Sequence, residues 1–283
     1  MNNLKYFFAT VIFSLLFMGC SDDSDNIVEP NPMEDLMKIY EFPADGYAIE
    51  IYSENPELEV GYNKISLRIK DVSNNEYVTN ANLSWMPVMH METKEHSAPH
   101  TALDNSENNS VYTGAIVFQM PSNETEYWDL QLTFSANGQT ITKTDQINVL
   151  QPADGLKKIQ VFVGNDDAKY VLAYVEPQVP EIGINDFEAV LYKMEDMMTF
   201  PLVENYTITV DPRMPGMDNH SSPNNQDLVY NAVSKMYEGK LSLTMTGYWK
   251  INLKLINQSG ETVKGEDVTE DNPASSLYFE LEF

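Results

Sequence analysis

Runs in which apolar and polar residues alternate recur from residue 63 to the end of the chain. This period of two, rich in β-branched and aromatic residues, predicts strands, because successive side chains of a strand point to opposite faces of a sheet. Turn-forming pairs separate the runs, and no long amphipathic helical pattern is present. The chain is therefore predicted to be all-β, with strands over residues 63–71, 112–120, 127–134, 140–150, 158–163, 169–176, 240–245, 249–256 and 277–283.

The two halves of the sequence repeat one another. A stretch with Pro and Gly over residues 151–158 interrupts the alternation and predicts a boundary. Each half is long enough for one immunoglobulin-like sandwich, so we expect two tandem β-sandwich domains over residues 36–152 and 156–283. The matched motifs follow in the same order: Gly61-x-Asn63 and Gly183-x-Asn185, Met86-Pro-x-Met89 and Met214-Pro-x-Met217, His96 and His220, Tyr112-x-Gly114 and Tyr237-x-Gly239, Phe118-x-Met120 and Leu243-x-Met245, and Trp128 and Trp249.

The first 35 residues predict export and anchoring. An apolar run from Tyr6 to Met18 is followed by Gly19 and Cys20, the only cysteine of the chain, so residues 1–19 are predicted to be a lipoprotein signal peptide and Cys20 the acylated residue. The alternative is an ordinary signal peptide with an incidental cysteine. Residues 20–35 are acidic, rich in Pro and Asn, and predict a disordered tether. This acidic stretch resembles the surface-export signals of Bacteroidetes lipoproteins, which implies the outer membrane, on the cell surface or facing the periplasm.

Charge and motif content narrow the function. The formal net charge of −26 opposes binding to nucleic acid and to anionic lipid head groups. The chain has one cysteine, so disulfides are not expected to stabilise the domains. Each domain then depends on a hydrophobic core, which a content of 42% apolar residues can supply. The sequence has no nucleophile elbow, no phosphate-binding glycine loop and no HExxH motif, and we expect a protein that is not an enzyme.

Methionine and histidine gather at matched positions of the two halves. Residues 86–100 hold three methionines and three histidines, and residues 214–223 hold two methionines and one histidine. Thioether sulfur is soft and uncharged and suits Cu(I), and imidazole adds a stronger donor for Cu(I) or Cu(II). In a Greek-key sandwich the strand before Met86 and the strand before Met120 lie in opposite sheets and end at one pole. The predicted ligands of two copper sites, one in each domain, are Met89, His96 and Met120, and Met217, His220 and Met245.

Each of these residues also has an ordinary structural interpretation. Methionine on a strand usually fills a core, which is the alternative for Met120 and Met245, and Met86 and Met214 are candidates for inward-facing strand residues. His96 and His220 could be exposed loop residues. Three further residues have no counterpart in the second half and either add Cu(II) capacity or decorate the rim of the first site: His90, Met91 and His100.

The ordered motifs resemble the YtkA-like and FixH-like domains, small immunoglobulin-like sandwiches of bacterial envelopes, over residues 58–135 and 180–257. That resemblance implies copper handling. Family members often carry a histidine soon after Met-Pro-x-Met, whereas His96 comes seven residues after Met89 and His220 three after Met217. We therefore expect an envelope lipoprotein that captures, buffers or delivers copper, with an envelope protein as the implied recipient. The alternative is an immunoglobulin-like interaction module that binds a protein or glycan at the cell surface.

Overall fold

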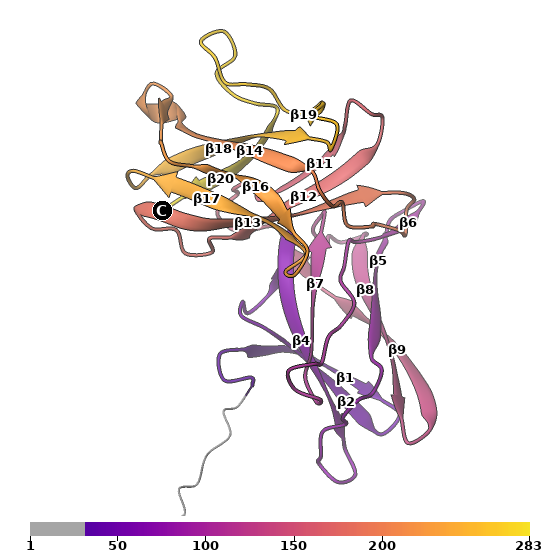
Figure 1. The fold of residues 1–283 in the computed structure, drawn as a ribbon. Coiled ribbons are helices and arrows are strands. Elements are labelled where there is room, and N and C mark those ends of the chain that lie inside the picture. Colours follow the sequence, from indigo (N-terminus) through magenta and orange to yellow (C-terminus); the bar gives the residue numbers. More distant parts are fainter. Residues whose placement is uncertain (1–31) are drawn as a thin grey trace, which may run out of the picture. The chain divides into compact units, whose positions relative to one another are not determined.

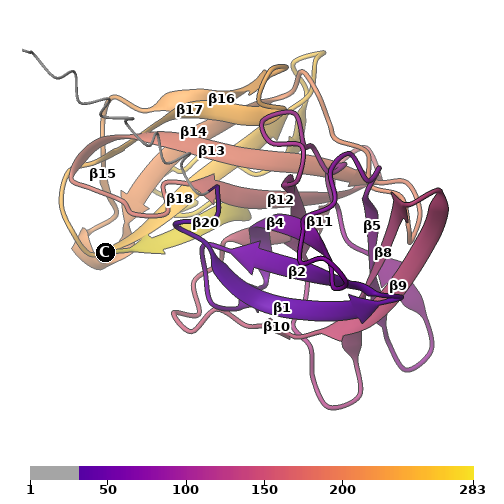
Figure 2. The same cartoon turned by 90° about the horizontal axis from the view of Figure 1, so that it is seen from below.

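The structure is a computed structural model that describes residues 32–283 (Figure 1, Figure 2). Its regular elements in this range are β-strands and one 3-10 turn, and the strands pair antiparallel except for β3 (Leu58–Glu59) with β10 (Val149–Leu150). Among the described residues no helix is long and apolar enough to cross a membrane. The prediction of an all-β fold with sandwich architecture is confirmed.

The first sandwich consists of two four-stranded sheets that enclose one core. Trp128, Phe118 and Ile49 are among its fully buried side chains. The first sheet has the order β1-β2-β4-β7, with β1 (Met37–Ala44), β2 (Tyr47–Ser53), β4 (Gly61–Asp71) and β7 (Tyr112–Phe118). The second sheet has the order β6-β5-β8-β9, with β5 (Ser84–His90), β6 (Glu95–Ser97), β8 (Tyr127–Ala136) and β9 (Gln139–Ile147).

The second sandwich is one ten-stranded sheet folded around its own core. β16 (Gln226–Asn231) pairs with strands of both layers and joins them. One layer has β11 (Ile159–Val163), β12 (Lys169–Glu176), β13 (Gly183–Met194) and β17 (Met236–Leu243). The other has β14 (Thr207–Met214), β18 (Tyr248–Ile256), β19 (Thr262–Lys264), β20 (Leu277–Glu282) and the short β15 (His220–Ser221), and the 3-10 turn η1 (Pro215–Met217) follows β14.

A separate cluster of buried side chains connects the two sandwiches. Val117 of β7 packs with side chains on β12 and β13, among them Val171, Ala173 and Tyr192, and none of these four is more than 4% exposed. Ser97 N of the first sandwich donates a backbone hydrogen bond of 2.8 Å to Met197 O of the second, which adds a polar contact. The outer face of the β12–β13 pair is therefore covered by the first sandwich.

The repeat seen in the sequence has the same structural meaning in both sandwiches. Asn63 accepts a hydrogen bond from Glu59 N and donates one to Glu59 O, and Asn185 does the same with Glu181. The glycine two residues before each asparagine has a positive φ, 116° at Gly61 and 129° at Gly183. An L side chain rarely adopts this conformation, which explains why both motifs begin with glycine.

Several observed strands escaped the sequence analysis, and β13, β16 and the hairpin of β1 and β2 are among them. β1 and β2 form a hairpin whose turn contains Asp45 and Gly46, both with positive φ, and an Asp-Gly pair of this kind is a signal that would have revealed them. β14 contains Asp211 and Pro212, and proline has no N–H for the ladder, so its sequence reads poorly as a strand. Each predicted run overlaps an observed strand.

Replacing Asn63 with Ala should destabilise the first sandwich. Asn63 is 8% exposed, and without its amide the backbone N–H and C=O of Glu59 lose their partner. We expect a loss of about 1–3 kcal/mol in the free energy of unfolding, measured by urea denaturation. Asn55→Ala, at an exposed asparagine, is the matched control and should leave the unfolding curve unchanged. Equal effects of the two substitutions would contradict a stabilising role for the hydrogen bonds between the Asn63 amide and the Glu59 backbone.

Candidate functional site

A methionine and a histidine lie opposite each other at one end of the first sandwich. Antiparallel pairing places Met89 of β5 opposite His96 of β6 on one side and opposite Trp128 of β8 on the other. Met89 is fully buried and His96 is half-buried, and the His96 ring meets the Trp128 ring edge-on with centroids 5.4 Å apart. Cross-strand partners on one face have neighbouring side chains. The thioether and the imidazole are therefore adjacent.

Trp128 also brings the second predicted sulfur ligand to this end. Its indole Nε1 donates a hydrogen bond of 3.0 Å to the carbonyl of Met120, two residues beyond the end of β7. Met120 is partly buried and packs against the first core. Because β5 and β7 belong to opposite sheets, this bond agrees with the expectation that the two strands end at one pole.

The ring of His96 is oriented in a way that suits a ligand. Its Nδ1 lies 2.8 Å from the carbonyl oxygen of Ser97, which can only accept a hydrogen bond. Nδ1 must therefore carry the proton, and Nε2 keeps its lone pair. Burial lowers the pKa of His96, nearby Lys94 and Lys169 lower it further, and the bond to Ser97 opposes them. The ring is thus neutral near pH 7, the form that donates to a metal.

The second sandwich repeats this arrangement at the end of β14. Met214 is opposite His220 of β15, and Arg213 opposite Lys250, so the next position places Met214 beside Trp249. Trp249 Nε1 donates a 3.0 Å hydrogen bond to the carbonyl of Met245, as Trp128 does to Met120. Met214 is 5% exposed, and Met245 packs against the second core.

The strand registers correct the alignment of the two halves. Pro87 pairs with Leu130 and Pro212 with Ile251, each two residues before the methionine that faces the histidine. Met89 therefore corresponds to Met214, and the match between Met-Pro-x-Met motifs was wrong by three residues. Met217, predicted as a ligand, is 51% exposed in η1. The letters matched because Pro215-Gly216-Met217, directly after the end of β14, repeats the Pro-x-Met pattern of residues 212–214.

Met89 also differs from the sequence interpretation. The polar and proline-containing sequence around it suggests a loop, but Met89 is an inward-facing residue of β5 and fully buried. Met86 lies on the opposite face of the same strand, where Ser97 Oγ donates to its Sδ at 3.3 Å. Met91 is partly buried against the first core.

The other two histidines of the first half differ in their free lone pairs. His90 has both ring nitrogens bonded to carboxylates, Nδ1 to Glu95 at 3.0 Å and Nε2 to Asp129 at 2.9 Å. His100 Nδ1 lies 2.8 Å from the carbonyl of Ala98, which leaves Nε2 with a lone pair. The ring nitrogens of His90 are therefore both occupied by carboxylates, whereas His100 keeps one nitrogen that could bind a metal.

Cys20, the predicted lipidation site, lies outside the described residues.

Sequence reasoning missed a group of methionines that approaches the first site. Met194 ends β13, and Met197 and Met198 lie in the turn that follows. Met197 O accepts the hydrogen bond from Ser97 N, next to His96. The density of methionine in residues 194–198 was a readable signal. It was overlooked because the first half has no equivalent.

Among residues 32–283, no three His, Cys, Asp or Glu side chains gather where they could hold a metal ion. The candidate sites are of another kind: in each, a methionine faces a histidine across two strands, and a second methionine is bonded through its carbonyl to the neighbouring tryptophan. Their candidate donors are one imidazole and two thioethers. Such a donor set is soft and carries no charge, and it fits Cu(I) better than hard cations such as calcium or magnesium.

Comparisons with known proteins identify no family. No family model matches the chain, and no curated protein matches it. Two solved structures are similar at 11% identity: a DUF4785 family protein from Legionella pneumophila, with a TM-score of 0.26 and 77% of this chain covered, and the Escherichia coli adhesin FdeC, with 0.25 and 85%. The chain spans 55% and 65% of their lengths. At these values neither bears on the function of this chain.

His96 should make the protein less stable in acid. Its pKa is lower in the folded state than in the unfolded state, so the unfolded chain binds more protons. Stability is full above the unfolded pKa of about 6.5 and falls as the pH drops below it. We expect the loss of unfolding free energy between about pH 7 and about pH 5, measured in urea, to be smaller in His96→Asn than in the wild type. An unchanged pH dependence in His96→Asn would refute the assignment.

Proposed function

We propose that this protein binds one Cu(I) ion at an end of each sandwich. The ligands in the first are Met89, His96 and Met120, and in the second Met214, His220 and Met245. One observation carries the proposal: in both sandwiches a buried methionine faces a histidine across two strands, beside a tryptophan whose indole holds the backbone of a second methionine. A core-filling methionine needs no histidine at the same cross-strand position in both repeats.

The donor chemistry supports Cu(I) in particular. Thioethers bind soft cations and carry no proton, and a neutral imidazole adds the stronger bond. The Nδ1 bond of His96 to a backbone carbonyl is the type of contact that orients metal-binding histidines through their second nitrogen. The YtkA-like and FixH-like resemblance, which implies copper handling, points in the same direction.

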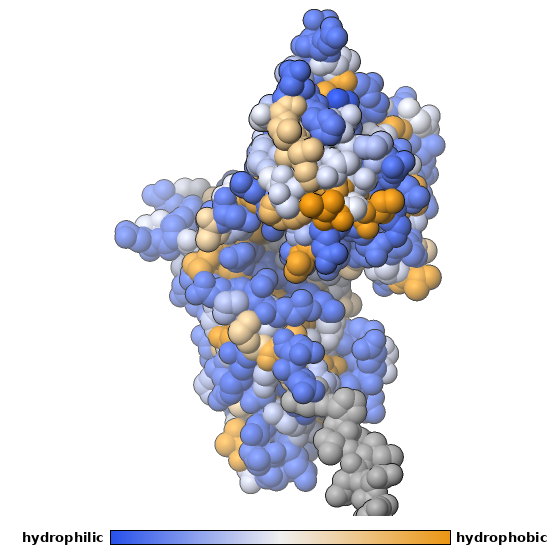
Figure 3. All heavy atoms as spheres, turned by 90° about the vertical axis from the view of Figure 1, so that its left-hand side faces the viewer, coloured by the Kyte–Doolittle hydropathy of each residue, from blue (hydrophilic) through white to orange (hydrophobic). Residues whose placement is uncertain are grey.

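We further propose that the protein is an outer-membrane lipoprotein anchored through Cys20, which captures, buffers or delivers copper to another envelope protein. The apolar run that is followed by Gly19 and Cys20, and the acidic segment after it, support this placement. Hydrophilic residues cover most of the face seen in Figure 3, with apolar residues in small separate patches. A surface with net charge −26 favours a cationic ligand and repels nucleic acid.

The second candidate function is an interaction module that binds a protein or glycan. Aliphatic side chains are exposed just before β13 and at its start, where Val179 is 80%, Ile182 62% and Ile184 64% exposed. Exposed apolar residues that adjoin one another often mark a contact surface. None of these residues is a proposed copper ligand, so substitutions can abolish one of the two functions and leave the other intact.

The decisive test is the Cu(I) stoichiometry of the mature chain in detergent, titrated without oxygen against a competing Cu(I) chelator. We expect two Cu(I) ions per chain. Met214→Leu and His220→Ala should each weaken one site by about tenfold or more, because a ligand is lost, and should leave the other site intact. A stoichiometry of zero would favour the interaction module.

The controls are methionines that the strand registers place elsewhere. Met217→Leu and Met86→Leu nearly conserve volume and should leave both affinities unchanged. If Met217→Leu weakens binding and Met214→Leu does not, the revised ligand set is wrong and the original sequence alignment was right.

Lipidation is tested separately. Cys20→Ala should release the protein from the membrane fraction, because no other acylation site is proposed, and mass spectrometry of the wild type should find a diacylglyceryl group on an N-terminal cysteine. Ser21→Ala is a matched neighbouring control and should stay in the membrane fraction. A wild-type protein recovered in soluble form with a free thiol would exclude the anchor.

A further inference from the structure

The two candidate copper sites differ in how accessible their histidines are. His96 is half-buried, with its ring against Trp128 and its Nδ1 bonded to Ser97 O. His220 is exposed and lies on a strand of two residues. The buried methionines do not share this difference, since Met89 is 0% and Met214 5% exposed. The asymmetry therefore lies in the imidazole and its surroundings.

A turn of the second sandwich lies against the first site. After β13 the chain forms a turn over residues 195–199, whose Met197 O accepts the hydrogen bond from Ser97 N. Figure 1 shows β6 close to the end of β13. Lys169 pairs with Met194 at that end of the sheet. Ser97 and Ala98, which follow His96, are fully buried.

This covering turn is held closed by one carboxylate. Asp196 Oδ1 accepts a hydrogen bond from Met198 N at 2.7 Å, and Oδ2 accepts one from Thr199 Oγ1 at 3.1 Å. Glu195 N donates to Thr199 O at 3.0 Å and closes the base of the turn. Removing the Asp196 carboxylate should therefore loosen the turn without altering any proposed copper ligand.

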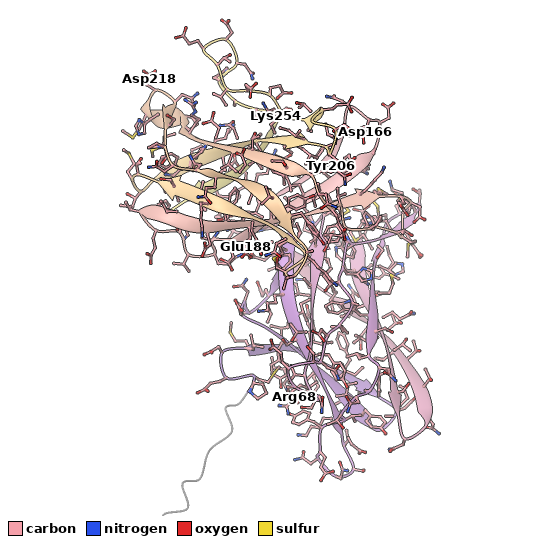
Figure 4. All side chains as sticks on the ribbon, in the orientation of Figure 1. Arg68, Asp166, Glu188, Tyr206, Asp218 and Lys254 are labelled. Atoms are coloured by element: carbon pink, nitrogen blue, oxygen red, sulfur yellow. The ribbon has the colours of Figure 1, made fainter. Side chains whose placement is uncertain are left out.

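The loop between β14 and β15, which leads into His220 at the second site, is open to solvent. Residues 215–218 are exposed, and Asp218 and Asn219 have positive φ values of 53° and 56°. Figure 4 labels Asp218 at an outer tip of the second sandwich. His220 follows directly, so solvent and dissolved ligands reach it.

Building on the proposed function, we propose that the second site exchanges Cu(I) and the first site retains it. Exchange between soft ligands requires an incoming donor to bond to the ion while a protein ligand leaves. At the second site the incoming donor can reach the ion beside His220, form its bond and displace the imidazole, with no electron transferred. At the first site the turn over residues 195–199 and the half-buried position of His96 block that approach. The protein thus has an exchange site and a holding site on one chain.

Release kinetics test this assignment. The mature chain in detergent, loaded with two Cu(I) ions, is mixed without oxygen with excess bathocuproine disulfonate, and the coloured chelate is followed. We expect a fast and a slow phase of equal amplitude. His220→Ala should change only the fast phase and His96→Ala only the slow one, because each weakens one site.

The covering turn gives a second test that does not depend on a ligand substitution. Asp196→Ala should accelerate the slow phase severalfold and leave the fast phase and the stoichiometry unchanged. The matched control is Asp104→Ala, because Asp104 holds a similar turn, accepting Ser106 N at 3.0 Å and Ser106 Oγ at 2.9 Å, away from both sites. It should change neither phase.

The outcomes separate the two proposals. If the wild type binds no Cu(I), the proposed function fails, and this inference fails with it. If two ions bind but leave at one rate, or if the fast phase disappears in His96→Ala, the inference is overturned and copper binding stands. If His96→Ala does not fold, as judged by circular dichroism, Asp196→Ala decides: an unchanged slow phase overturns the inference.

Discussion

The arrangement at one end of each sandwich depends on a buried tryptophan, Trp128 of β8 in the first sandwich and Trp249 of β18 in the second. Trp128 and Trp249 are fully buried, and an indole N–H without a partner in such a place would cost about 1–3 kcal/mol. Each finds its partner in a methionine carbonyl on the chain that leaves the opposite sheet. A hydrogen bond and a core side chain thereby fix where the two layers meet. The residues around that point, the methionines and the histidine, have their positions set by it.

Alternation along the strands then sorts residues that are chemically alike. Met86 and Met89 are three positions apart on β5, so they face opposite sides of the sheet, and only Met89 lies beside Trp128. The same rule separates His90, which binds Glu95 and Asp129 on the outer face, from His96, whose ring lies over the core. A cluster of soft donors in the sequence becomes one candidate ligand set and a group of residues with other contacts.

The contact between the sandwiches makes the two repeats unequal. A buried apolar cluster ties β7 to β12 and β13, and this places the methionine turn over residues 195–199 beside β6. In the second repeat the loop that leads into His220 is exposed. Two copies of one motif can therefore differ in accessibility although their donors are the same, because the environment comes from the neighbouring repeat.

The sequence alone determined the strands with regular alternation, the all-β class, the internal repeat and the residue types that could bind copper. These are local properties, readable because a strand has a period of two and a turn needs particular residues. Tertiary structure decided that Met214 rather than Met217 faces His220, that Met89 is buried, and that a turn of the second sandwich is hydrogen-bonded to Ser97, next to His96. Register depends on which residues pair across strands distant in sequence, and a shift of three residues moves a side chain to the other face of the sheet. No local pattern contains that information, since it arises only when Trp128 and Trp249 are packed into their cores.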